Sequence, residues 1–231
     1  MEMRPAEERR ELLVDLYKRA SGCLLCPLSE GRTQVVFGAG NADADLMFVG
    51  EAPGFHEDQQ GLPFVGRAGK LLDELLEGVG LRRDDVFITN VLLCRPPGNR
   101  DPQPDEIETC KPYLYRKVEL IEPTVVCTLG NFATKLLTGS NRGITTVRGR
   151  PQTHTLGTRS VRIYPLLHPA AGLRTPAVRA QLQEDFAGLP ALLGQPPLAA
   201  EARLQPVPTP VPAPHGAPAP APGASQLNLF G

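Results

Sequence analysis

The chain has 231 residues, of which 41% are hydrophobic and 21% charged, and its net charge is −1 at pH 7. No apolar run approaches the roughly 20 residues that a membrane-spanning helix needs, and the charged start MEMRPAEERRELL lacks the apolar core of a secretory signal. We therefore expect a cytoplasmic protein, in which five cysteines serve as metal ligands or core residues and not as disulfides.

The first predicted element is an amphipathic helix over residues 6–20, and the C-x2-C pair of Cys23 and Cys26 follows it. One such turn presents two thiolates to a metal, and a second pair, Cys94 and Cys110, completes a four-ligand set. The alternative is four ordinary buried cysteines. The spacing alone does not separate zinc from iron–sulfur, so the metal stays open at this point.

Four short apolar runs are predicted to be strands, at residues 45–51, 86–93, 124–130 and 162–168. Nearly continuous apolar runs are typical of strands buried on both faces, and Cys127 within the third is expected to be a core residue. Pro165 in the fourth indicates an edge strand or a local break.

Helical patterns separate and follow these runs. Pro112 is expected to kink the helix predicted at residues 107–121 or to mark its true start. Gly139 is the expected C-cap of the helix predicted at residues 131–138. The alternation predicts an α/β domain over residues 1–194 with a parallel sheet, whose functional residues lie at the carboxyl ends of the strands. The predicted helices cover residues 71–79, 107–121, 131–138 and 178–193.

Residues that could bind a ligand or take part in catalysis lie at or near these strand ends. GEAPG (residues 50–54) offers outward backbone N–H groups for a ligand. Phe64, on a glycine-bounded loop, is either a stacking platform for a base or a core plug. Asn90 either ties down a loop or reads the imide edge of a pyrimidine, because both uses need its donor and its acceptor. His168 is either structural or part of a site.

The charge is distributed unevenly along the chain. Residues 1–122 hold 15 basic and 22 acidic residues, whereas residues 123–183 hold eight basic residues and no acidic one. A segment this long without a carboxylate favours contact with a polyanion over chance. The eight basic residues are Lys135, Arg142, Arg148, Arg150, Arg159, Arg162, Arg174 and Arg179.

A Pro/Ala-rich tract over residues 195–224 is predicted to be an extended, disordered linker. It ends in SQLNLFG, residues 225–231, where large apolar residues return. The simplest alternative for this ending is a random hydrophobic terminus.

Taken together, the motifs resemble the family 4, iron–sulfur-containing, uracil-DNA glycosylases. The resemblance covers roughly residues 8–190. Its features are the first cysteine pair, GEAPGFHEDQQGLPFVGRAGKLLD, TNVLLCRPPGNRDP, Cys110 and LLHPAAGLR. It implies a three-layer fold with a central four-stranded parallel sheet, an enzyme of base excision repair that flips uracil out of DNA and hydrolyses its C1′–N1 bond, and association with the nucleoid.

The resemblance also implies roles for individual residues. Phe64 would stack on the flipped uracil, Asn90 would bind its imide edge, and His168 would donate to O2 as charge builds there. Gly50, Glu51, Ala52 and Gly54 would line the pocket, with Asn99 and Glu51 as candidates for handling water. Leu173 is the candidate wedge, and Arg174 would contact phosphate. The implied cofactor is a 4Fe-4S cluster, preferred over zinc, held by Cys23, Cys26, Cys94 and Cys110.

Two departures and one further resemblance affect this interpretation. Family 1 relatives have a water-handling aspartate where this chain has Ala52, and a thymine-blocking tyrosine where it has Gly54. The C-terminal segment resembles the short peptide with which bacterial proteins bind the DNA sliding clamp. Its clamp-binding candidates are Gln226, Leu227, Leu229 and Phe230.

Two other hypotheses remain at this stage, and in every case we expect a monomer. One is a non-catalytic DNA-binding module built on the four-cysteine metal site, which explains the charge and the tail but not the strand-end residues. The other is a glycosylase for a different deaminated base. Glu51 and Asn90 favour uracil.

Overall fold

The computed structural model describes residues 5–196 and residue 198. These residues form a sheet of six strands in the order β1-β3-β2-β4-β6-β5. The inner four, β3, β2, β4 and β6, are parallel, and the outer two are antiparallel to their neighbours. The strands are β1 (Ala39–Gly40), β2 (Leu46–Gly50), β3 (Phe87–Asn90), β4 (Val125–Leu129), β5 (Gln152–Leu156) and β6 (Arg159–Leu166).

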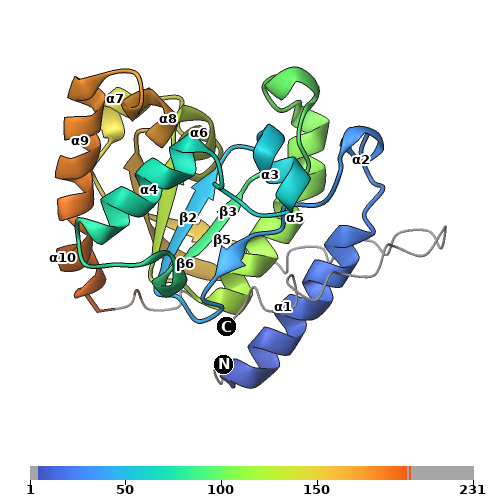
Figure 1. The fold of residues 1–231 in the computed structure, drawn as a ribbon. Helices are drawn as coiled ribbons and strands as arrows, with labels where there is room; N and C mark the ends of the chain where they lie inside the picture. The colour runs from blue at the N-terminus through green and yellow to red at the C-terminus, as the bar shows by residue number, and fades with distance from the viewer. Residues whose placement is uncertain (1–4, 197, 199–231) are drawn as a thin grey trace.

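Helices cover both faces of the sheet (Figure 1). One core lies between the sheet and α1, α5 and α6, and the other between the sheet and α4, α9 and α10. None of the described helices is long and apolar enough to cross a membrane. The helices are α1 (Ala6–Ser21), α2 (Leu28–Gly31), α3 (Phe55–Gln60), α4 (Arg67–Glu77), α5 (Pro104–Ile121), α6 (Asn131–Thr138), α7 (Ile144–Val147), α8 (Pro169–Gly172), α9 (Pro176–Ala187) and α10 (Leu189–Leu193).

The predicted α/β class is confirmed, and the strand count is corrected from four to six. All four predicted apolar runs form the parallel part of the sheet, and Cys127 is fully buried there. The sequence analysis missed β1, which has two residues, and β5, which alternates between exposed and buried positions. Neither carries a continuous apolar run, because each lies at an edge.

The expectation that Pro165 marks an edge strand is wrong, since β6 lies between β4 and β5. The carbonyl oxygen of Pro165 accepts a hydrogen bond from the Gly149 backbone N–H at 2.9 Å. In a strand, the nitrogen and oxygen of one residue point to the same side. The missing N–H of Pro165 therefore faces away from β4, and the parallel ladder to β4 stays intact.

Two helices differ from the sequence prediction. α5 begins at Pro104, where Gln103 and Glu106 form a capping box, and it runs through Pro112. Pro112 therefore does not mark its start. The helix predicted at 178–193 is two helices, α9 and α10, which meet at Gly188. Gly139, in the left-handed region with φ 65°, does cap α6 as predicted.

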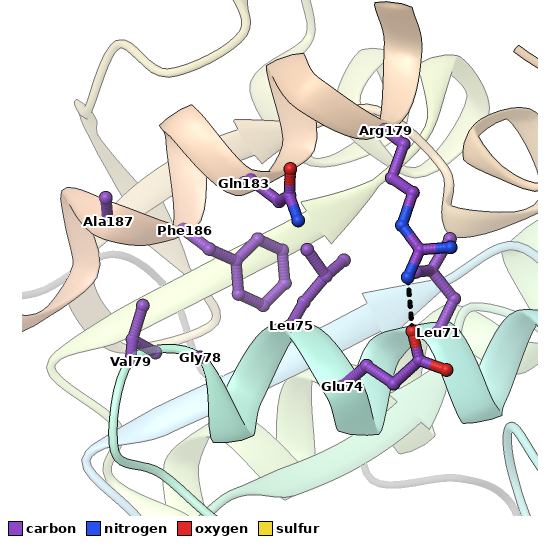
Figure 2. Close-up of a pocket in the computed structure, with 9 residues that line it drawn as sticks. All are labelled: Leu71, Glu74, Leu75, Gly78, Val79, Arg179, Gln183, Phe186 and Ala187. Atoms are coloured by element: carbon purple, nitrogen blue, oxygen red, sulfur yellow. Dashed lines mark hydrogen bonds and ion pairs between the residues drawn. The ribbon is translucent and has the colours of Figure 1, made fainter. Parts of the chain in front are cut away.

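Helices α4 and α9 pack side by side on the sheet and leave a small pocket of about 270 Å³ between them (Figure 2). Leu71, Leu75 and Phe186 contribute apolar surface to it, and Arg179 pairs with Glu74 at 2.5 Å. None of the site residues predicted from the sequence lines this pocket. This pocket lies between two helices that cover the sheet, and the candidate site lies elsewhere.

Candidate active site

The carboxyl ends of β2 and β4 and the segment after β6 contribute to one open pocket of about 610 Å³. Ligands of open α/β sheets bind at this edge, because the loops that leave the parallel strands meet there. The lining residues are Glu51, Asp101, Ile107, Leu129, Gly130, Asn131, Phe132, Lys135, Leu136 and His168. Two of the predicted site residues, Glu51 and His168, are among them.

Asn90 and Phe64 meet at Gly50, and His168 lies against Phe64. A Cβ atom added at Gly50 would overlap Asn90 Oδ1 and lie 2.8 Å from Cζ of Phe64, so only glycine lets the Asn90 amide and the Phe64 ring lie this close to the strand end. The Phe64 and His168 rings are stacked, with centroids 5.8 Å apart. Asn90 is 2% exposed, and no hydrogen bond joins its side-chain amide to another described residue. That amide therefore remains available for a ligand.

The loop that carries Phe64 is held in a strained conformation. Phe64 has φ 53°, a left-handed backbone that is rare for an aromatic residue and concentrates at functional sites. The Glu57 carboxylate accepts hydrogen bonds from the Val65 and Gly66 N–H groups, each at 3.0 Å. The Arg83 guanidinium donates to the Phe64 carbonyl at 3.2 Å and to the Pro63 carbonyl. These contacts hold the backbone around Phe64 and so fix the position of its ring.

His168 is positioned as a neutral hydrogen-bond donor. Its Nδ1 accepts a hydrogen bond from the Ala170 N–H at 3.1 Å, at the start of α8. An accepting Nδ1 leaves the proton of the neutral ring on Nε2. Burial lowers the pKa of His168, and the negative charge of Glu57 opposes this in part. At neutral pH the ring can thus donate from Nε2 without being charged.

Two carboxylates, Glu51 and Asp101, line the same pocket. Burial raises the pKa of Glu51, and the negative charge of Asp101 raises it further. Asn99 does not line the pocket: it is exposed, has φ 53°, and its Oδ1 accepts a hydrogen bond from Arg95 Nε at 2.8 Å. The structure thus supplies a second acidic group that the sequence analysis did not single out.

Four of the five cysteines lie near one another, beyond the loop that carries Asn99 and Asp101. None is in a disulfide, and Cys23, Cys26, Cys94 and Cys110 influence one another electrostatically. Burial raises the pKa of Cys94 to about 11 and that of Cys110 to about 12. Arg32 Nη1 donates to the Cys23 carbonyl at 2.7 Å and contacts Cys94 Sγ at 3.5 Å.

These cysteines are not arranged around a single point. Among the described residues, no three His, Cys, Asp or Glu side chains are grouped closely enough to hold one metal ion. A zinc ion needs each sulfur about 2.3 Å from one centre, whereas an iron–sulfur cluster distributes its cysteine ligands over several iron atoms. The donor set, all cysteine and free of disulfides, is of a kind that holds either zinc or an iron–sulfur cluster.

The remaining predicted residues are half-buried, exposed or outside the described part of the chain. Ala52 and Gly54 are half-buried beside Glu51, Leu173 is half-buried against the α4–α9 core, and Arg174 is exposed. Gln226, Leu227, Leu229 and Phe230 lie outside the described residues. The structure brings Arg174 into α8's C-terminal turn but does not place it in the pocket.

A buried lysine that the sequence analysis missed supports the end of β3. Lys117 of α5 is fully buried, and its ammonium group donates to the Phe37 carbonyl at 2.7 Å and to Thr89 Oγ1 at 2.5 Å. Burial lowers its pKa to about 7. Since Thr89 precedes Asn90, this lysine helps to fix the strand end from which Asn90 projects. An isolated Lys on a predicted helix gave no sequence signal for this role.

Sequence comparisons with known proteins identify the family of this chain. Residues 37–187 match the model of the uracil DNA glycosylase superfamily. The chain is 44% identical over 189 residues to the type-4 uracil-DNA glycosylase of Archaeoglobus fulgidus, covering 80% of this chain and 95% of that protein. It is 48% identical to the Sulfurisphaera tokodaii protein of the same name (71% and 77% covered) and 47% identical to that of Thermotoga maritima (72% and 85%). The chain therefore belongs to the type-4 uracil-DNA glycosylases of the uracil DNA glycosylase superfamily.

Proposed function

We propose that this chain is a hydrolase of DNA repair that extrudes uracil from DNA and cleaves its C1′–N1 bond, leaving an abasic site. The meeting of Asn90 and Phe64 at Gly50, with the His168 ring against Phe64, is the observation that supports this function. A non-catalytic DNA-binding module would not need an available amide, a strained aromatic and a neutral donor at one point. Extrusion costs a few kcal/mol, which binding in the pocket must offset.

Recognition of the base rests on Phe64 and Asn90. Stacking of a base on an aromatic ring contributes about 1–3 kcal/mol, and the contacts of Arg83 and Glu57 hold the Phe64 loop before the base arrives. The Asn90 amide offers one donor and one acceptor. Uracil presents the complementary O4 and N3–H, whereas cytosine reverses this pattern, so the amide favours uracil.

Departure of the base rests on His168. Cleavage leaves negative charge on the uracil, and a preorganised donor aimed at that charge typically accelerates a reaction by about 10²–10³. The Nε2–H of a neutral imidazole is such a donor, and Nδ1 is already engaged by the Ala170 N–H. The backbone around Gly50 and Glu51, with the half-buried Ala52 and Gly54, is proposed to line the pocket.

The positive charge that builds on the sugar needs a partner, and Glu51 is the proposed one. It lines the pocket with His168, in the position next to the alanine that replaces the family 1 aspartate. Its pKa is raised by burial first and by Asp101 second, so it acts only once deprotonated. Asn99 is proposed to hold the attacking water, which requires its side chain to leave Arg95.

A 4Fe-4S cluster is the proposed cofactor, held by Cys23, Cys26, Cys94 and Cys110. When bound, it would serve as a structural tie between the turn after α1, the exit of β3 and α5. The purified protein is then expected to be brown, with iron–sulfur visible absorbance. A colourless protein with bound zinc would contradict this assignment.

The DNA surface and the tail complete the proposal. Among the described residues, Lys135, Arg142, Arg150 and Arg174 of the acid-free segment form no ion pair, and Arg174 follows the proposed wedge Leu173.

Residues 225–231 are proposed to bind a sliding clamp. The segment at 195–224 would serve as their linker, in a nucleoid-associated, cytoplasmic monomer. Removal of residues 226–231 should abolish clamp binding and leave excision from a short oligonucleotide unchanged; equal clamp affinity would discard the idea.

One assay tests the central function. The protein is incubated with single- and double-stranded DNA that contains one uracil, and abasic sites are then cleaved. Asn90→Ala and His168→Ala should each suppress the product while DNA binding survives. Excision at the parental rate by both variants would overturn the site assignment, and excision of a different deaminated base in preference to uracil would overturn the substrate.

A further inference from the structure

The pocket at the strand ends extends beyond the place of the base. Its volume of about 610 Å³ lies within the range of pockets that hold whole drug-sized ligands, which a single pyrimidine ring does not fill. Phe64, Asn90 and Gly50 are not among its lining residues, although His168 and Glu51 are. The pocket volume therefore lies beside the Phe64–Asn90 site, next to His168 and Glu51, where residues of α5 and α6 line it.

This outer part of the pocket has an apolar wall. Phe132 and Leu136 of α6 and Ile107 of α5 line it, and each is half-buried against the core that α1, α5 and α6 share with the sheet. Phe132 and Leu136 are four positions apart, so they lie on one face of α6. An aromatic ring on such a wall can stack with a base regardless of sequence.

Lys135 lies beside this wall, and its ammonium group has no partner in the part of the chain that the structure describes. It lines the same pocket, and it forms neither an ion pair nor a hydrogen bond with another described residue. Glu51 and Asp101, which line the pocket too, are not within ion-pair distance of its ammonium group. An unpaired lysine in a pocket is suited to an anionic ligand.

The pocket is thus polarised in the way that a nucleotide is. The carboxylates of Glu51 and Asp101 belong to the segments that follow β2 and β3, and the ammonium group of Lys135 belongs to α6. A deoxyribose that becomes positive at C1′ carries a negative phosphodiester on its other side. A strand laid from Glu51 towards α6 satisfies both charges.

We propose that the α5–α6 side of this pocket is a second subsite, for the nucleotide joined to the deoxyuridine in the same strand. Lys135 binds the phosphate that links the two nucleotides, and Phe132 stacks on the neighbouring base. This inference rests on the proposed uracil excision and adds a subsite to it. It applies to an unpaired neighbour, because a base stacked on Phe132 has left its duplex stack.

The test uses short single-stranded oligonucleotides with one uracil, in which either phosphate next to the deoxyuridine is a neutral methylphosphonate. Lys135→Gln removes the charge and keeps an unbranched polar side chain, one carbon shorter. It should raise KM roughly tenfold on the all-phosphate strand with kcat little changed, and reduce the salt slope of log kcat/KM by about 0.7. Lys135→Arg should restore the parental KM.

The neutral linkages show whether the lysine acts on the phosphate. With the relevant linkage neutral, the parent and Lys135→Gln should have the same KM. Arg159→Gln is the matched control, because Arg159 belongs to the acid-free segment but begins β6 at the opposite edge and pairs with Glu122 at 3.4 Å. An equal effect of Lys135→Gln on charged and neutral strands, or no effect at all, would overturn the subsite.

The base contact has a separate test. Phe132→Leu keeps an apolar side chain and should raise KM several-fold on an ordinary strand, but not when the neighbouring nucleotide is replaced by a base-free spacer. The same loss on both strands would exclude stacking. Excision by the parent protein is measured first: its absence rejects the proposed function, whereas an active parent with insensitive Lys135 and Phe132 variants rejects the subsite alone.

Discussion

At the scale of single residues, the candidate site depends on polar atoms that the fold leaves available. Asn90 is 2% exposed and its amide forms no hydrogen bond with another described residue, and His168 uses Nδ1 internally so that Nε2 can face a ligand. Neither side chain is among the wholly buried, unpaired polar groups of the described residues, so both stay accessible to a ligand, and we expect that ligand to be the substrate. Asn90 and Phe64 can both lie beside this strand end because position 50 has no side chain and leaves space for them.

Gly50→Ala tests this space directly. The new methyl group would overlap Asn90 Oδ1 and approach the Phe64 ring to within 2.8–2.9 Å, so the base should be displaced from its productive position. Displacement on the order of 1 Å can cost about 100-fold in rate, and we expect at least that loss in excision. The folded state should persist by circular dichroism.

Gly31→Ala is the control for that substitution, since an added Cβ there meets nothing within 4 Å. Its excision rate should equal that of the parent. Parental activity in Gly50→Ala would mean that the base does not bind against this backbone.

Asp101→Asn tests the coupling of the two carboxylates by pH. The pKa of Glu51 is raised by burial first and by Asp101 second, so loss of the Asp101 charge makes Glu51 easier to deprotonate. If excision requires the Glu51 carboxylate, the acid limb of the rate profile under single-turnover conditions should move to lower pH. Asp105→Asn, an exposed change on α5 outside the pocket, should leave the profile in place. An unmoved acid limb in Asp101→Asn would separate Asp101 from the chemistry.

Part of this site was predictable from the sequence, and the reason is topological. His168 ends one apolar run and Asn90 interrupts another, at the residue where β3 ends, and the ends of parallel strands share one edge. Asp101 and Lys135 come from a loop and a helix face, whose directions depend on tertiary packing, so no pattern placed them in the pocket. Asn99 shows the limit of a motif: its residue type suits water binding, but in the structure its side chain is engaged by Arg95.

At the scale of elements, the parallel strands were predictable because each is buried on both faces and reads as an apolar run. The edge strand β5, QTHTL, has polar residues at exposed positions and gives no such run. The break between α9 and α10 was missed because both segments continue the same apolar stripe across Gly188. Short elements such as α3 are fixed by contacts with their neighbours: Glu57 of α3 binds the loop that carries Phe64.

Arg83→Met tests the support of that loop. Arg83 follows α4 and binds the Phe64 and Pro63 carbonyls and Asp73, so its loss should release the strained Phe64 backbone. We expect roughly tenfold slower excision and a loss of about 1–2 kcal/mol in the free energy of unfolding, measured by urea denaturation. Arg82→Met is the control, because Arg82 is largely exposed and pairs only with Asp85 at 3.7 Å. An equal effect of both substitutions on excision would exclude a specific role for Arg83.

At the scale of the whole molecule, segments distant in sequence are joined at the four cysteines. Cys23 and Cys26 follow α1, Cys94 follows β3, and Cys110 lies within α5, from which Lys117 reaches the end of β3. α1 also contributes Leu13, Leu16 and Tyr17 to the core, so the core itself would hold it without a cluster. The cluster is therefore expected to affect the region around α2 and the loop with Asn99 more than the sheet.

Cys26→Ser tests this division of labour. Loss of one ligand should bleach the visible absorbance, and backbone amides of residues 21–33 and 94–103 should then exchange hydrogen faster by mass spectrometry, because those segments rely on the cluster as a tie. Amides of β2 and β4, buried in the parallel sheet, should keep their protection.

Cys127→Ala is the matched control, because this thiol is fully buried within β4, away from the other four. The colour should remain, while stability should fall modestly because of the small cavity left behind. Uniform deprotection of the sheet in Cys26→Ser would mean that the whole fold, and not this region alone, depends on the four-cysteine site.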